Sequence, residues 1–282
     1  MAGTPFSQVL KTATIDYRKE YDRLYLMFYK HKILNDAKEE VLFPLRDFCA
    51  YYFIKFPFRG TCLNLDDFNA SYGFIFEQEP TNFDIDYLVS FCEYSYNLVC
   101  ASRFFSDIGS LECMDKAVKQ YIVQVQSVIE KIGYMPNTKN SVTDFVPKDT
   151  AAIAVAEIID PQLSYRVIEY NHHSMKGDIK RKEEIIIALA KQLEPQNEKL
   201  KQINRAMESD LFFLFNNLNI RHNNIDPNGK SCISYVAAMK DKELEQWYDD
   251  TYQMCLLAFL ELEHLDRKKR IAQLKADIQS QS

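Results

Sequence analysis

The sequence predicts a mostly α-helical protein made of two helical parts, and three observations carry this prediction. Its 282 residues include only seven glycines and nine prolines, too few for the many tight turns of sandwiches, barrels and doubly wound sheets. Apolar residues recur three and four positions apart through most of the chain, as they do on one face of a helix. Apolar types make up 47% of the residues, which argues against a disordered or low-complexity chain.

The first part, residues 1–135, is expected to be a mostly helical domain. The apolar spacing predicts helices over residues 15–28, 41–53, 85–99 and 118–132. Pro44 lies within the second of these, so that helix is either kinked at Pro44 or begins there. The segment 56–80 contains both Pro and Gly and loses the helical period, which predicts a long ordered loop.

Residues 136–150 are expected to form a linker, because Gly133 and Pro136 end the preceding helix and turn-forming residues follow. Residues 151–282 are then expected to form an antiparallel helix bundle. The spacing in this part predicts helices over residues 163–193, 196–218 and 241–278. The break at Glu194-Pro195 predicts that the first two form a helical hairpin.

Charge and cysteine usage limit the class of protein. The chain has 34 basic and 40 acidic residues, so generic binding of a polyanion is not expected and any contact with RNA must be local. Seven cysteines without a C-x-x-C pair predict a reducing, cytoplasmic location. The first residues lack a signal peptide and no stretch reaches about 18 apolar residues, so no membrane association is expected.

The segment most informative about chemistry is FNNLNIRHNNIDPNGK, residues 215–230. It places Arg221, His222 and two amides behind a strongly apolar helix. Arg offers a planar fork of donors that suits a phosphate, and His can accept and donate a proton near neutral pH. Cleavage of RNA without a metal needs a base for the 2′-hydroxyl, a cation at the phosphorus centre and an acid for the leaving oxygen.

Arg221 followed by the polar His222, at the start of the last helical hairpin of a helical bundle, resembles the signature of the HEPN superfamily. The resemblance covers about residues 165–265. It implies a metal-independent endoribonuclease of the toxin, abortive-infection or CRISPR-associated type, with a site shared across a homodimer. The family motif continues with a His four to six positions after the Arg, where this chain has Ile225, Asp226 and Pro227. Either His222 performs the proton transfer, or the site is degenerate and non-catalytic.

The function expected from this segment is a metal-independent endoribonuclease of a bacterial defence system, with Arg- and His-assisted attack of the 2′-hydroxyl on RNA. The candidate catalytic residues are Arg221, His222 and Asn223, and the candidate substrate-binding residues are Asn217, Asn224 and Lys230. No metal and no cofactor are expected. The alternative is a non-catalytic helical interaction module, such as an adaptor or sensor subunit of a larger defence or phage-related complex. A helix end followed by a turn explains the same residues without any activity.

His172-His173 is a second candidate. Adjacent residues on a helix point about 100° apart, so the pair is not expected to bind one metal ion. We expect it to form a solvated helical face, or alternatively to supply an acid to the Arg221 site. The basic runs 176–182 and 267–270 are expected to be solvated helix surface, or a phosphate track if Arg221 binds RNA.

The chain is rich in large aromatic residues, with 17 tyrosines and 19 phenylalanines. The runs 51–53, 74–76 and 104–105 cannot all face inward from one helical stripe. Some aromatic surface is therefore expected to be left exposed, which predicts a protein partner and favours a homodimer.

Overall fold

The computed structural model describes residues 15–32, 43–76, 83–105, 112–226 and 228–280. These residues are mostly helical and contain a single two-stranded sheet, which confirms the predicted fold class. The chain divides into two compact units, Met1–Phe145 and Val146–Ser282. Among the residues described, no helix has both the length and the apolar character that crossing a bilayer requires.

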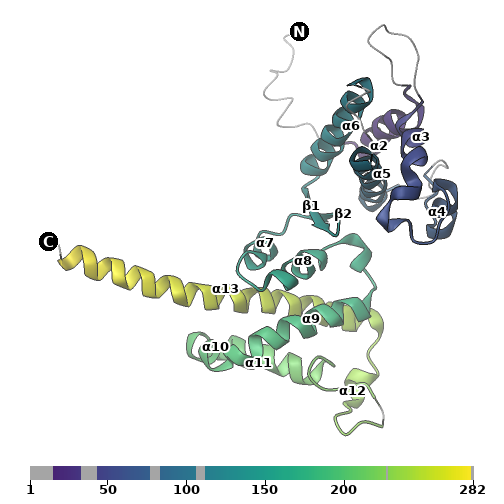
Figure 1. Ribbon diagram of the computed structural model, residues 1–282. Coiled ribbons are helices and arrows are strands. Elements are labelled where there is room, and N and C mark those ends of the chain that lie inside the picture. Colours follow the sequence, from purple (N-terminus) through teal and green to yellow (C-terminus); the bar gives the residue numbers. More distant parts are fainter. Residues whose placement is uncertain (1–14, 33–42, 77–82, 106–111, 227, 281–282) are drawn as a thin grey trace, which may run out of the picture. The chain divides into compact units, whose positions relative to one another are not determined.

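Helix α5 (Ile85–Phe105) is the centre of the first unit (Figure 1). It packs against α2 (Tyr17–Tyr25), α3 (Leu45–Tyr52) and α6 (Glu112–Lys131). Its side chains are buried on most sides of the helix: Leu88, Val89, Phe91, Cys92, Leu98 and Val99 are all in the core. A helix that is apolar all round belongs inside a protein, which explains the central position of α5.

Short helical segments connect these helices. A π-helical turn, η1 (Leu26–Lys30), continues α2, and two 3₁₀ turns, η2 (Phe53–Lys55) and η3 (Pro57–Arg59), follow α3. Pro44 is the N-cap of α3, so the helix begins there and is not kinked. A proline costs little at this point because its missing N–H would have had no partner inside the helix.

The long loop predicted over residues 56–80 is largely helical, apart from residues 77–80, which lie outside the described ranges. It contains η3 and a further helix, α4 (Leu65–Tyr72). The Asn64 side chain accepts a hydrogen bond from the Asp67 N–H at 2.8 Å, and Gly73 ends the helix with a φ of +72°. The boundary signals of α4 are therefore strong, but two helical turns are too short to show a clear apolar period.

The division between the two units falls within residues 136–150, which were expected to form a linker, but these residues have regular structure. These residues form most of a β-hairpin of β1 (Tyr134–Lys139) and β2 (Val142–Pro147), and α7 (Thr150–Ala156) begins soon after it. Asn140 and Ser141 form the turn with φ values of +50° and +64°. Two consecutive residues with positive φ produce the turn whose twist matches that of a hairpin.

Side chains of α5 stabilise this hairpin. The Asn97 amide donates to the Thr143 carbonyl at 2.7 Å and accepts from the Thr143 N–H at 2.8 Å. The Glu93 carboxylate accepts a hydrogen bond from the Phe145 N–H at 2.6 Å. Asn97 and Glu93 thus bond to the backbone of β2 as a neighbouring strand would. A pattern in one sequence cannot reveal such contacts between distant residues.

Replacing Asn97 with Ala is expected to lower the free energy of unfolding of the first unit by about 1–3 kcal/mol, because the Thr143 N–H and carbonyl lose their partner. Amide hydrogen exchange at Thr143 should accelerate in the same variant. Gln120→Ala, on the exposed face of α6, is the control and should change neither quantity. Unchanged exchange at Thr143 in Asn97→Ala would contradict this account of the hairpin.

The second unit is organised around its long last helix, α13 (Asp241–Ser280), which packs against α7, α9, α10 and α11 (Figure 1). The other elements are α8 (Pro161–Glu169), η5 (His173–Met175), α9 (Ile179–Leu193), η6 (Glu194–Gln196), α10 (Asn197–Ile203), α11 (Arg205–Asn217) and α12 (Ser234–Ala237). Met207, Leu211 and Leu214, which lie three and four positions apart on α11, are buried.

Two of the long helices predicted in this unit are interrupted. The helix predicted over 163–193 is divided into α8 and α9, and Gly177, with a φ of +78°, lies in the connection. The helix predicted over 196–218 is divided at Asn204, whose backbone is not helical and whose side chain accepts a hydrogen bond from the Met207 N–H at 3.1 Å. Asn204 therefore ends α10 and caps α11 at once.

A buried ammonium joins three helices of this unit. Lys182 of α9 donates to Glu245 and to Asp249 of α13, each at 2.7 Å. The Tyr170 hydroxyl, at the end of α8, donates to Asp249 at 2.9 Å. Tyr170 also stacks on Tyr252 of α13 with ring centroids 3.9 Å apart. The hydrogen bonds from Lys182 and from the Gly177 N–H hold the pKa of Glu245 below its usual 4.5.

We expect Lys182→Met to lower the free energy of unfolding of the second unit by about 1–3 kcal/mol, because two charged hydrogen bonds are lost while the side-chain volume is kept. Lys180→Met, on the exposed side of α9, is the matched control. The lowered pKa of Glu245 stabilises the fold above pH 4.5, and this contribution disappears as the pH falls through the folded pKa. The difference in the free energy of unfolding between wild type and Lys182→Met, measured by chemical denaturation, should therefore shrink below pH 4.5. A difference that stays constant with pH would contradict this role of Lys182.

Candidate functional site

The candidate residues lie on the loop between α11 and α12, and two asparagines fix its conformation. The Asn219 N–H donates to the Asn224 side chain at 2.9 Å, and the Asn224 N–H donates to the Asn219 side chain at 3.0 Å. Asn219 adopts a φ of +62°, a conformation that Asn tolerates better than most residues. Its amide also donates to Glu183 of α9 at 2.6 Å, which attaches the loop to the bundle.

Asn224, a candidate substrate-binding residue, is buried with 2% of its surface exposed. Besides its two bonds to Asn219, its amide donates to the Ser231 carbonyl at 3.0 Å, and its own carbonyl accepts the Ile233 N–H at 2.8 Å. The side chain therefore closes the loop from inside and is not presented to a ligand. Asn219 was absent from the sequence-based candidates, although Asn just after a helix is a known signal for positive φ.

Arg221 lies on the surface of this loop in an ion pair that the sequence did not indicate. Its Nε lies 2.9 Å from a carboxylate oxygen of Glu194 in η6, and its Nη1 donates to Asn216 at 3.0 Å. Its backbone N–H donates to the Phe215 carbonyl at 2.9 Å. About a third of each side chain of the Arg221–Glu194 pair is exposed. Much of the charge that would meet a phosphate is thus already balanced by a carboxylate.

The remaining candidates are distributed along the loop and do not converge on Arg221. His222, Asn223 and Lys230 are exposed. The Asn223 side chain accepts a hydrogen bond from the Asp226 N–H at 3.1 Å, which forms a local turn. Asn217, the last residue of α11, donates to the Phe213 carbonyl at 2.7 Å. Among these candidates, Arg221, His222 and Lys230 combine surface exposure with the chemistry of a cation or a general base.

The pair His172-His173 does not lie on a helix, so the expected solvated helical face is wrong. His172 follows α8, and His173 begins the short turn η5. The irregular backbone brings the two rings to a centroid distance of 4.2 Å, closer than the helical argument implied. His172 Nδ1 lies 2.7 Å from the Ser174 hydroxyl and accepts a hydrogen bond from the Ser174 N–H at 3.2 Å, which caps the turn.

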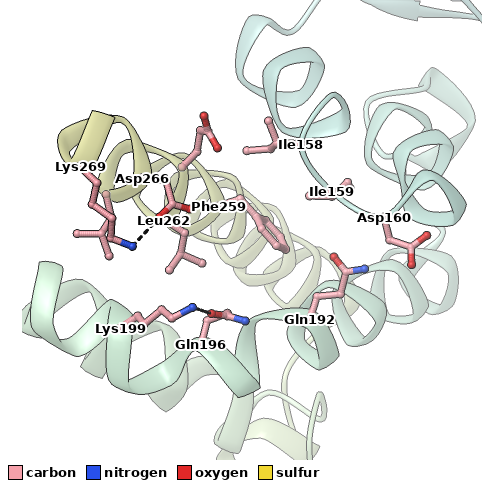
Figure 2. A pocket seen from close by; sticks show the side chains of 12 residues that line it. Ile158, Ile159, Asp160, Gln192, Gln196, Lys199, Phe259, Leu262, Asp266 and Lys269 are labelled. Atoms are coloured by element: carbon pink, nitrogen blue, oxygen red, sulfur yellow. Dashed lines mark hydrogen bonds and ion pairs between the residues drawn. The ribbon is translucent and has the colours of Figure 1, made fainter. Parts of the chain in front are cut away.

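The second unit also contains a pocket of about 390 Å³ (Figure 2). Ile158 and Ile159 line it from the α7–α8 corner, Gln192 and Gln196 from the α9–α10 corner, and Phe259 from α13. None of its lining residues belongs to the segment 215–230. The pocket is therefore a separate feature from the Arg221 loop.

The polar groups at the rim of the pocket are paired with one another. Lys269 forms an ion pair with Asp266 at 2.9 Å and lowers the pKa of that carboxyl, and Lys199 donates to Gln196 at 2.9 Å. The lining contains no His or Cys, and it contains no Ser, Thr or Tyr. The lining offers apolar contact and amides, together with three carboxylates and two ammonium groups.

Comparison with known proteins found no match: no family model, no curated protein sequence and no solved structure resembles this chain significantly.

Replacing Asn224 with Ala is expected to lower the free energy of unfolding by about 1–3 kcal/mol, because the Asn219 N–H and the Ser231 carbonyl lose their buried partner. Asn223→Ala is the matched control on the same loop and should cost less, since its only bond described is to one exposed N–H. Thermal denaturation of both variants measures this. Equal effects at the two positions would contradict the structural role assigned to Asn224.

Proposed function

We propose that this protein is a helical protein–protein interaction module. The observation that carries the proposal is that α13 extends beyond the helices that pack against it (Figure 1). This helix also has large apolar side chains on its surface. The most exposed of these are Leu257, Ile271, Leu274 and Ile278, each with at least 47% of its surface accessible. A helix with exposed apolar side chains at helical spacing is a common docking element.

The environment of Arg221 supports the same proposal. A guanidinium that serves a phosphate needs its donors directed at the ligand, whereas those of Arg221 are directed at Glu194 and Asn216. Asn223 and Asn224 are used in the hydrogen bonds of the loop itself. Of the three candidate catalytic residues, Arg221 and Asn223 are thus used in contacts that hold the loop, and His222 is the one that these contacts do not explain.

A metal-independent endoribonuclease is the second candidate, and one observation favours it. Arg221 and His222 are both exposed on one loop, so that an RNA strand could reach them. Activity would require Glu194 to release Arg221, and a general acid or base in addition to His222. The resemblance to HEPN nucleases belongs to this second candidate.

Incubation of the purified protein with total RNA, with and without EDTA, distinguishes the two candidates. We expect the RNA to remain intact in both conditions. Arg221→Ala should then only remove a half-exposed ion pair, which costs about 0.2–1 kcal/mol of stability. Lys230→Ala on the same exposed loop is the control for a simple loss of positive charge.

Cleavage that persists in EDTA would overturn the proposal if both Arg221→Ala and His222→Ala abolish it. A positioned proton-transfer group contributes about 10²–10⁴-fold in rate, so the loss in either variant should be large. Cleavage that both variants retain would instead indicate a contaminating nuclease, which a repurified sample identifies.

A further inference from the structure

The exposed side of α13 carries a seven-residue repeat between Leu257 and Ile278. Its first positions are Leu257, His264, Ile271 and Ile278, and its fourth positions are Leu260, Arg267 and Leu274. Leu257, Ile271, Leu274 and Ile278 are 47%, 48%, 58% and 58% exposed, and Leu260 is half-buried. Apolar residues alternating at spacings of three and four form the contact seam of a coiled coil. The residues that pack α13 into its own bundle, such as Thr251 and Cys255, lie on another side of the helix.

We propose that this seam pairs with the same seam of a second copy of the chain, with the two α13 helices antiparallel and centred between Leu265 and Asp266. The inference rests on the proposed function and names its partner. The charges that flank the seam favour a second copy as the partner. When two copies pair antiparallel, an acidic residue beside one seam faces a basic residue beside the other.

In this register the apolar layers lie on both sides of a polar centre. Ile271 faces Leu260 of the second copy, and Leu274 faces its Leu257. The two-fold axis repeats each contact, so Leu257, Ile271 and Leu274 each gain an apolar partner, and Ile278 faces Gln253. His264 faces Arg267 at the centre, where a polar layer fixes the register at some cost in stability.

The flanking charges agree with the same register. Glu263 faces Arg270 of the second copy on one side of the seam. On the other side Lys268 lies opposite Glu261, whose carboxylate accepts a hydrogen bond from Asn204 of its own chain at 3.2 Å. Each pair occurs twice by symmetry. Within one chain Glu263 already contacts Arg267 at 3.2 Å and Arg270 at 3.4 Å, so the pairing extends an existing network. Flanking charges of this kind select the partner and the orientation of coiled-coil helices.

The other arrangements place like charges together. In a parallel pair, Arg267 would meet its own copy inside the seam and Arg270 would face Lys275. An antiparallel shift of one repeat in one direction brings Arg270 against Arg270 and Glu263 against Asp277. The shift in the other direction brings Glu263 against Glu263. Of these arrangements, only the register centred between Leu265 and Asp266 places Glu263 opposite Arg270 with no like-charged pair on that flank.

Light scattering and sedimentation of the full chain at micromolar concentration test the pairing. Wild type should have a mass near twice its 33.0 kDa chain mass. The variant Ile271→Glu/Leu274→Glu should be monomeric, with unchanged helix content because both side chains are exposed. The control Ala272→Glu/Ala276→Glu adds the same charge off the seam and should remain dimeric. A monomeric wild type, or a dimer in the seam variant, would overturn the proposal.

Two single-charge variants test the orientation. Glu263→Arg and Arg270→Glu should each weaken self-association about tenfold or more, because each places two like-charged pairs in the dimer. When mixed, they should form a heterodimer in which both pairs are again opposite in charge. Failure of the mixture to associate would overturn the antiparallel register.

These results are independent of the RNA experiment. A dimer that cleaves RNA through Arg221 would overturn the proposed function alone. A monomer that leaves RNA intact would overturn the pairing alone.

Discussion

The second unit depends on one buried ammonium group. Lys182 cannot lie inside the protein without compensating charge, so the bundle must bring Glu245 and Asp249 to it, and this requirement fixes how α9 lies along the first turns of α13. The hydroxyl of Tyr170, at the end of α8, donates a hydrogen bond to Asp249, so α8, α9 and α13 are joined by one cluster of charged and polar groups. The remaining helices then pack on an α13 whose rotation is already set, which decides which of its sides is buried and which faces solvent.

The division of α13 into a buried and an exposed side underlies the proposed function. The buried side ends where the bundle ends, but the helix continues, and its exposed side keeps an apolar repeat that the bundle does not need. The loop around Arg221 shows the reverse situation. Its residues look like a reactive group in the sequence, yet Asn223 and Asn224 bond within the loop and Arg221 pairs with Glu194 of η6. A cluster of polar residues in a sequence can therefore mark a turn that needs many hydrogen bonds as well as a reactive site.

The sequence predicted the fold class and most long helices, because apolar spacing over many residues reports directly on packing. It failed where local signals were short or where the decisive contact was distant. Two helical turns in α4 were too few for a period, and Asn204 interrupts a stripe that continues on both sides of it. The hairpin of β1 and β2 could not be read because its support comes from Asn97 and Glu93, more than forty residues earlier. The sequence indicated Arg221 as a candidate residue, but it did not indicate Glu194, because this partner in the ion pair lies in a distant segment.

The contact between α5 and β2 also protects the protein from other chains. The edge of a small sheet normally offers unpaired N–H and carbonyl groups to any extended peptide, and it can template aggregation. Here the Thr143 and Phe145 N–H groups and the Thr143 carbonyl are occupied by helix side chains, so this edge has no bonds left at those positions for a passing strand. A two-stranded sheet, which would be marginal in isolation, is thereby closed by a helix on the side where a third strand would add.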